Sequence, residues 1–129
     1  MSLLLLLLRL VMGHALADFA LQNSDMAKGK NRNNKPDPTK APPGQKYVPC
    51  WCYFLSAHAL IHGGTVWMIT DVWQLGVAET CLHWAIDFMK CENKINPHVD
   101  QFLHFLCKVI YILYILATCG GGCACYLYP

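Results

Sequence analysis

The chain has 129 residues, which is enough for one domain of ordinary size. It is 55% hydrophobic and only 14% charged, well below the roughly 25% charged residues of ordinary soluble domains. This composition argues against an ordinary soluble domain and favours a membrane protein, whereas the net charge of +2 is unremarkable.

A Leu-rich segment at residues 2–21 comes first. At about 1.5 Å of rise per residue, it is long enough to cross a bilayer core of roughly 30 Å. The alternative is a signal peptide, because Ala15-Leu16-Ala17 resembles a cleavage site at which residues 1–17 would be removed. We expect a helix instead, because Arg9 lies inside the Leu run and no basic residue precedes it.

The basic, proline-rich segment at residues 23–49 separates this helix from the rest of the chain. It has little apolar content, so we expect a mobile loop without a core of its own. Apolar segments flank it on both sides, so a cytoplasmic loop is favoured over a nucleic-acid-binding segment. Three more helices are expected at about residues 51–70, 72–89 and 97–118, followed by a Gly- and Cys-rich tail at 119–129.

These segments predict an all-α fold, a four-helix transmembrane bundle that forms a single membrane domain over residues 1–129. The loops at 23–49 and 90–96 carry the Lys and Arg residues and lie on the same side of a four-span topology. The positive-inside tendency therefore places both loops in the cytoplasm and both termini outside. An external tail would allow its cysteines to pair as a disulfide.

Each of the four apolar segments contains two polar residues four positions apart. The pairs are His14 and Asp18, His58 and His62, His83 and Asp87, and Asp100 and His104. On an α-helix this spacing puts both side chains on one face. The sequence therefore predicts that every helix directs two potential metal ligands toward one place.

The predicted topology sorts these residues into two layers about 6 Å apart along the helix axes. The layer nearer the cytoplasm would hold Asp18, His58, Asp87 and Asp100, and the deeper layer His14, His62, His83 and His104. A third, still deeper layer could join Arg9, Glu79 and Lys108 in an internal ion cluster. The alternative for Arg9 or Lys108 is that its side chain extends singly to the outer interface.

A bound divalent cation would offset the cost of burying three aspartates, each of which costs about 2.5–3.5 kcal/mol at a helix centre. Imidazole and carboxylate ligands suit Zn, Mn or Fe. Eight candidates exceed the ligands of one zinc, so two metals, or one metal with outer-shell partners, would use them better. The alternatives are haem, which leaves the aspartates unexplained, and an interhelical His–Asp hydrogen-bond network without metal.

The chain resembles a family of small bacterial and phage membrane proteins catalogued as domain of unknown function 3307. The resemblance rests on Gly13-His-Ala-Leu-Ala-Asp-Phe-Ala-Leu-Gln22 and on the three later pairs, with Lys30 and Lys90 among the matching residues. It implies a multi-pass membrane protein of unestablished activity. Paired His and Asp residues on apolar helices are also similar, by analogy only, to membrane-bound metal-dependent hydrolases.

The functional hypothesis is a metal-dependent hydrolase in the bacterial inner membrane, acting on a lipid or lipid-linked phosphoester. The four-histidine layer would hold the metal, and Asp18, Asp87 and Asp100 would complete a second site or act as general base. The alternative is a non-enzymatic interaction protein, such as a phage accessory factor, whose His/Asp centre is structural. Metal transport ranks lower, because the outer halves of the second and fourth helices have few polar residues.

Overall fold

The computed structural model describes residues 2–35, 43–44 and 50–119. The tail cysteines Cys123 and Cys125 and most prolines of the basic loop lie outside the described residues, and so do the expectations placed on them. The elements are α1 (Leu3–Ala15), the π-helix η1 (Leu16–Ala20), α2 (Ser24–Gly29), α3 (Trp51–Thr70), α4 (Trp73–Cys91) and α5 (Pro97–Cys119). The described residues are helical without a strand, which confirms the all-α class.

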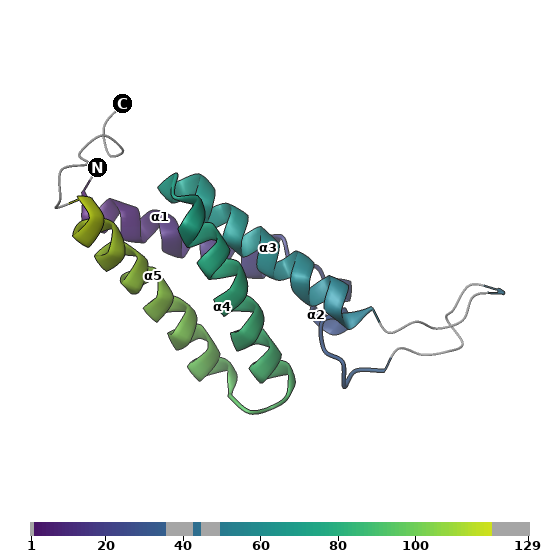
Figure 1. Ribbon diagram of the computed structural model, residues 1–129. Helices are drawn as coiled ribbons and strands as arrows, with labels where there is room; N and C mark the ends of the chain where they lie inside the picture. Colours follow the sequence, from purple (N-terminus) through teal and green to yellow (C-terminus); the bar gives the residue numbers. More distant parts are fainter. Residues whose placement is uncertain (1, 36–42, 45–49, 120–129) are drawn as a thin grey trace.

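The four long helices form a bundle in which each helix has two neighbours. Helix α1 packs against α3 and α5, and α4 packs against the same two helices. The start of α1 and the end of α5 lie at one end of the bundle, whereas α2 and the α4–α5 connection lie at the other (Figure 1). The four segments predicted to be helical therefore enclose one common interior.

A close approach of α3 and α4 is made possible by two glycines. A Cβ atom on Gly63 would collide with Thr80 and with the carbonyl oxygen of Gly76, and one on Gly76 would lie 2.8 Å from the Cβ of Trp67. The two helices are joined by Asp71 and Val72 alone, and Asp71 adopts a left-handed conformation with φ of 57°. Gly63 of α3 and Gly76 of α4 therefore allow the two helices to pack closely.

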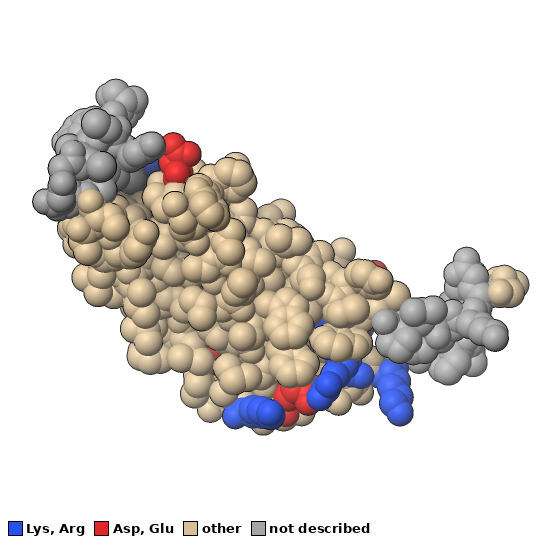
Figure 2. Space-filling view, viewed as in Figure 1, with Lys and Arg blue, Asp and Glu red and all other residues tan. Residues whose placement is uncertain are grey.

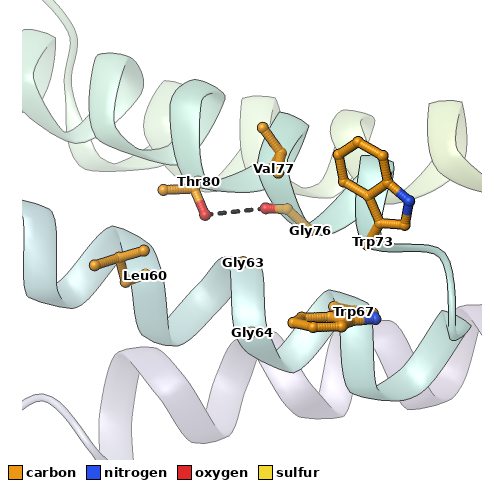
Figure 3. A pocket seen from close by; sticks show the side chains of 8 residues that line it. All are labelled: Leu60, Gly63, Gly64, Trp67, Trp73, Gly76, Val77 and Thr80. Carbon is orange, nitrogen blue, oxygen red and sulfur yellow. Dashed lines mark hydrogen bonds between the residues drawn. The ribbon is translucent and has the colours of Figure 1, made fainter.

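An apolar pocket of about 490 Å³ lies over this contact (Figure 3). Its lining residues are Leu60, Gly63, Gly64, Trp67, Trp73, Gly76, Val77 and Thr80. None of these residues belongs to the four polar pairs.

The segment after η1 corrects the expectation of a loop without buried contacts. Residues 24–29 form α2, whose N-cap Asn23 accepts a hydrogen bond from the Met26 amide at 2.8 Å. Gly29 lies against the ring of Phe54, and the following Lys30 is buried. The composition predicted a solvated segment, but α2 packs on α3. The Lys30 side chain that follows α2 donates to the buried Asp87 carboxylate.

The interior is divided along the bundle into an apolar part and a polar part. The apolar core cluster includes Leu6, Leu10, Val66, Leu75, Ile112 and Ile115. The buried polar or charged residues are Asp18, Lys30, His58, His62, Glu79, His83, Asp87, Asp100, His104 and Lys108. The bundle surface is the reverse: large apolar side chains are exposed on all four long helices, and much of the face in Figure 2 carries no charge.

Among the described residues, two segments are long and apolar enough to cross a membrane by length and composition, Leu3–Ala20 and Pro97–Thr118. The sequence predicted four such spans, so crossing of a membrane by α3 and α4 stays a prediction.

Candidate metal centre

The structure brings the four polar pairs together. His14 comes from α1 and Asp18 from η1, His58 and His62 from α3, His83 and Asp87 from α4, and Asp100 and His104 from α5. Seven of these side chains are buried, and His14 is nearly so, with 11% of its side chain exposed. Since each pair comes from a different part of the chain, their meeting is a property of the fold.

Asp18, His58, Asp87 and Asp100, which we call the acidic layer, contact one another directly or through Lys90. His58 Nε2 lies 3.2 Å from Asp18 Oδ1 and 3.4 Å from Asp87 Oδ2. Lys90 Nζ lies 2.8 Å from both the Asp87 and the Asp100 carboxylates. The grouping agrees with the layer predicted from the helix directions.

The deeper residues, His14, His62, His83 and His104, form a histidine layer. The ring centroids of His62 and His83 are 3.6 Å apart, and those of His83 and His104 are 4.1 Å apart, with both pairs stacked. His14 completes the layer, at 4.8 Å from the His62 ring and 5.0 Å from the His104 ring. None of the ligand sets found among the described residues consists of these four histidines alone, so the predicted four-histidine cradle does not form as one set.

The third predicted layer forms without Arg9. Glu79 accepts hydrogen bonds from Lys108 and, at 2.8 Å, from the Tyr111 hydroxyl, and all three side chains are buried. Arg9 is exposed on α1. The sequence offered no signal for the third member, Tyr111.

A change of helix type positions Asp18. The hydrogen bond from the Leu21 amide to the Leu16 carbonyl, at 3.0 Å, spans five residues and marks a π-turn. Such turns are frequent at functional sites. Asp18 thereby contacts His58 and His62 on α3, each with Nε2 at 3.2 Å from Oδ1.

Three polar residues at this end were missed as site residues. Lys30 donates to Asp87 at 2.6 Å, Lys90 bridges two carboxylates, and the Gln101 amide donates to Asp18 at 3.0 Å. Lys90 lies three residues after Asp87, so helical spacing could have found it. Lys30 is 57 residues from Asp87 in the chain, and the residues next to it in sequence are typical of a solvated loop.

A model of the family described as "Protein of unknown function (DUF3307)" matches residues 5–122. The chain belongs to the DUF3307 family. The matched range contains all four polar pairs, and the family resemblance is thereby confirmed. No curated protein and no solved structure is similar enough to this DUF3307 chain to count as a match. The analogy to metal-dependent hydrolases stays a prediction.

The distances between ligand atoms in this DUF3307 protein can be compared with those of a metal site and those of a hydrogen-bond network. The histidine–carboxylate distances range from 3.2 to 3.7 Å. Most hydrogen bonds between nitrogen and oxygen are shorter, about 2.7–3.2 Å. A tetrahedral ion with bonds of about 2.0–2.1 Å places its ligand atoms about 3.3 Å apart. The observed spacing is compatible with ligands around an ion, and its shortest distances also reach the hydrogen-bond range.

Many ring nitrogens of the four pairs are buried without a hydrogen-bond partner among the described residues. All five histidines of the pairs have at least one buried nitrogen without a hydrogen-bond partner among the described residues, and both nitrogens of His14, His58 and His83 are in this state. Buried polar atoms are nearly always paired, because an unpaired one costs roughly 1–3 kcal/mol. A bound cation that accepts imidazole lone pairs is one arrangement that would satisfy so many buried nitrogens at one place.

Among the described residues, three sets of side chains have ligand atoms within 4.8 Å of one another. They are Asp18, His58, His62 and His83; His14, His62, Glu79 and His83; and His83, Asp87 and His104. The first set differs from the others in how the charge of its carboxylate is balanced. Asp18 contacts three histidines and Gln101, whereas Asp87, Asp100 and Glu79 each contact at least one lysine.

Proposed function

We propose that this chain is a membrane-embedded four-helix bundle that binds a divalent transition metal at its centre and uses it for hydrolysis.

The membrane part of the proposal is supported by the distribution of polar and apolar side chains in the bundle, with apolar side chains outside and many polar ones inside. Phe19, Met68 and Phe102 are 79%, 86% and 63% exposed on three different helices, whereas ten polar or charged residues are buried. In water this arrangement would leave apolar surface unburied, whereas lipid solvates it. The basic residues at the α2 and α4–α5 end favour that end as the cytoplasmic one.

The single observation that carries the metal proposal is the environment of Asp18. Its carboxylate is buried, contacts no lysine or arginine among the described residues, and has the Nε2 atoms of His14, His58 and His62 within 3.4 Å. A cation among these groups would balance the carboxylate charge and take up the imidazole lone pairs. We therefore assign the site to Asp18, His58, His62 and His83, with Zn, Mn or Fe as the ion.

Hydrolysis is proposed because this site has an unbound base beside it. An ion there would supply Lewis-acid activation of water and of a phosphoryl or acyl group. Both ring nitrogens of His14 lack hydrogen-bond partners among the described residues, and its side chain is more exposed than those of the other histidines of the centre. In the proposed reaction His14 would accept a proton from water, while Asp87 and Asp100, held by Lys30 and Lys90, keep their charges balanced. A lipid-linked phosphoester is the substrate class that fits a site at this depth.

A structural centre is the second candidate. It is favoured by the burial of His58, His62 and His83, each at most 1% exposed. In that case the bundle would act through a partner, and the ion would only hold the helices together.

Metal content tests the proposal. The detergent-purified protein, analysed by elemental mass spectrometry, should contain at least one transition-metal equivalent, and both Asp18→Asn and His62→Ala should lose it. His98→Ala is the matched control, because His98 is exposed at the start of α5, outside the centre. A wild-type protein that stays free of metal after reconstitution with Zn or Mn would refute the metal site.

Hydrolysis is tested separately with fluorogenic phosphoesters and lipid esters on metal-loaded protein in nanodiscs. The proposal expects turnover that is lost in His14→Gln while the metal is retained. A metal-loaded protein that hydrolyses none of these substrates, and unfolds when the metal is chelated, would favour the structural centre.

A further inference from the structure

The buried group formed by Glu79, Lys108 and Tyr111 is not among the four metal ligands assigned above. It lies one helical turn from His83, with Glu79 Oε1 3.5 Å from His83 Nδ1. The three residues are 1–3% exposed and lie between the centre and the apolar core of the bundle. A buried carboxylate with a lysine and a tyrosine fixed on it requires an explanation, because burying charges costs free energy even when they are paired.

We infer that Glu79 is a positioning residue for the metal centre: it holds the Nδ1 side of His83 so that Nε2 is the ligand. The inference rests on the proposed metal site. Histidine ligands of metals almost always donate their second ring N–H to a carboxylate, a carbonyl or a water, which fixes the ring and its tautomer. Nδ1 of His83 is buried and has no hydrogen-bond partner among the described residues, and the Glu79 carboxylate, 3.5 Å away, is the acceptor that we assign to it.

The two nitrogens of the His83 ring have different environments, which is why we assign Nε2, and not Nδ1, as the metal ligand. Nδ1 lies beside Glu79, whereas Nε2 lies 3.7 Å from Asp87, on the side of the acidic layer. Glu79 is itself fixed, since Tyr111 donates to Oε2 and Lys108 to Oε1. A carboxylate whose two oxygens are both held has little freedom to move, so it is suited to orient a neighbour.

Direct coordination by Glu79 is disfavoured by the same contacts. Glu79 Oε1 already accepts from the Lys108 ammonium, which would oppose a second cation at that oxygen. The set that includes Glu79 also needs His62, whose Nε2 is its one buried unpaired nitrogen and is already used by the Asp18 set. The two sets therefore compete for His62, and only one of them can be filled through that atom.

The test compares metal affinity in three variants of the full chain in nanodiscs, with Zn²⁺ as the probe and a chelator as competitor. Glu79→Gln should weaken Zn²⁺ binding about 10–100-fold, the range for loss of an outer-shell partner. The charge-balanced double variant Glu79→Gln/Lys108→Met should be equally weak. Tyr111→Phe, which removes one hydroxyl donor to Glu79, should have a smaller effect in the same direction.

The double variant separates orientation from charge. If the single variant bound weakly only because Lys108 was left unpaired, removing Lys108 would restore the wild-type affinity, and the inference would be wrong. The Co²⁺-loaded forms provide a second readout: a shifted ligand-field spectrum in Glu79→Gln, with the same number of histidine ligands, is expected for an outer-shell residue. Loss of one oxygen ligand from that spectrum would instead make Glu79 a direct ligand and would overturn the assignment.

Two outcomes keep this inference apart from the metal proposal. Wild-type protein that binds no Zn²⁺ would refute both. Wild-type protein that binds Zn²⁺ and loses it in His62→Ala, but binds equally well in Glu79→Gln, would refute only the role of Glu79.

Discussion

The Lys30 ammonium donates to the Asp87 carboxylate at 2.6 Å, across 57 positions of the chain, inside the bundle. Lys30 comes from the end of α2, a short helix in a segment whose composition predicts a solvated loop. The same Asp87 oxygen lies 3.4 Å from His58 Nε2. The polar end of the centre is therefore closed by a residue from outside the four long helices, so α2 belongs to the site.

Replacing Lys30 should destabilise the bundle. Removing one partner of a buried ion pair usually costs about 3–5 kcal/mol, because the other charge is left uncompensated. We expect Lys30→Met to cost somewhat less, about 2–3 kcal/mol, because Lys90 remains 2.8 Å from Asp87. Unfolding in detergent with increasing denaturant measures the change. Lys28→Met, at an exposed position of the same short helix, is the control and should have little effect.

Two adjacent glycines of α3 provide a matched pair of variants. Gly63→Ala should destabilise the bundle by about 1–3 kcal/mol, the usual cost of overpacking, because the new methyl group would meet the Gly76 backbone. Gly64→Ala should leave the stability unchanged or raise it, because its Cβ would meet nothing within 4 Å and alanine is the better helix former. Thermal unfolding of both variants, followed by helical circular dichroism, makes the comparison. Equal stability of the two would mean that α3 and α4 are not packed as closely as described.

The spacing of the polar pairs was sufficient to predict the centre, for a physical reason. Two residues at i and i+4 lie on the same face of a helix, and on an apolar helix that face is the buried one. The depth of each residue along the bundle then follows from the direction in which its helix runs. The same reasoning placed Glu79 and Lys108 together, because their distances from Asp87 and Asp100 are equal. Depth along the helix was therefore predictable, whereas the rotation of each ring was not, and the stacking of His62 on His83 could not be foreseen.

Other features depend on local geometry that has no sequence signature. The π-turn at η1 changes the direction of Asp18 without a proline or glycine to mark it. Asp71 and Gln74 resemble a capping box, but Asp71 ends α3 in a left-handed conformation and Val72 is the N-cap of α4. Asn96 before Pro97 behaves as an ordinary N-cap, accepting from the Val99 amide at 2.9 Å. A tight hairpin between α3 and α4 leaves Asp71 no room for the usual cap.

The aspartates of the centre should differ in their effect on metal binding. Asp18→Asn removes the carboxylate that contacts histidines but no lysine among the described residues. Because Asp18 is a proposed direct ligand, its loss should weaken Zn²⁺ binding by at least about 100-fold, which is the upper end of the range for outer-shell residues. Asp100→Asn should weaken binding less, because Asp100 is paired with Lys90 and belongs to none of the ligand sets. Chelator competition on both purified variants gives the two affinities. A larger loss in Asp100→Asn would place the ion elsewhere in the acidic layer.

The contact between the α2 segment and the end of α4 should weaken in acid. Arg32 donates two hydrogen bonds, of 2.6 and 2.7 Å, to the Glu92 carboxylate, and these bonds lower the pKa of that carboxyl below its ordinary value of 4.5. A carboxyl with a lowered pKa stabilises the folded state above its unfolded pKa, and this contribution is lost as the pH falls through the folded pKa. Hydrogen exchange of residues 24–34, corrected for the intrinsic effect of pH, should show stronger protection in wild type than in Glu92→Gln at pH 7. The difference between the two proteins should shrink as the pH falls below about 4.5, and a difference that stays constant down to pH 2 would contradict the role given to this pair.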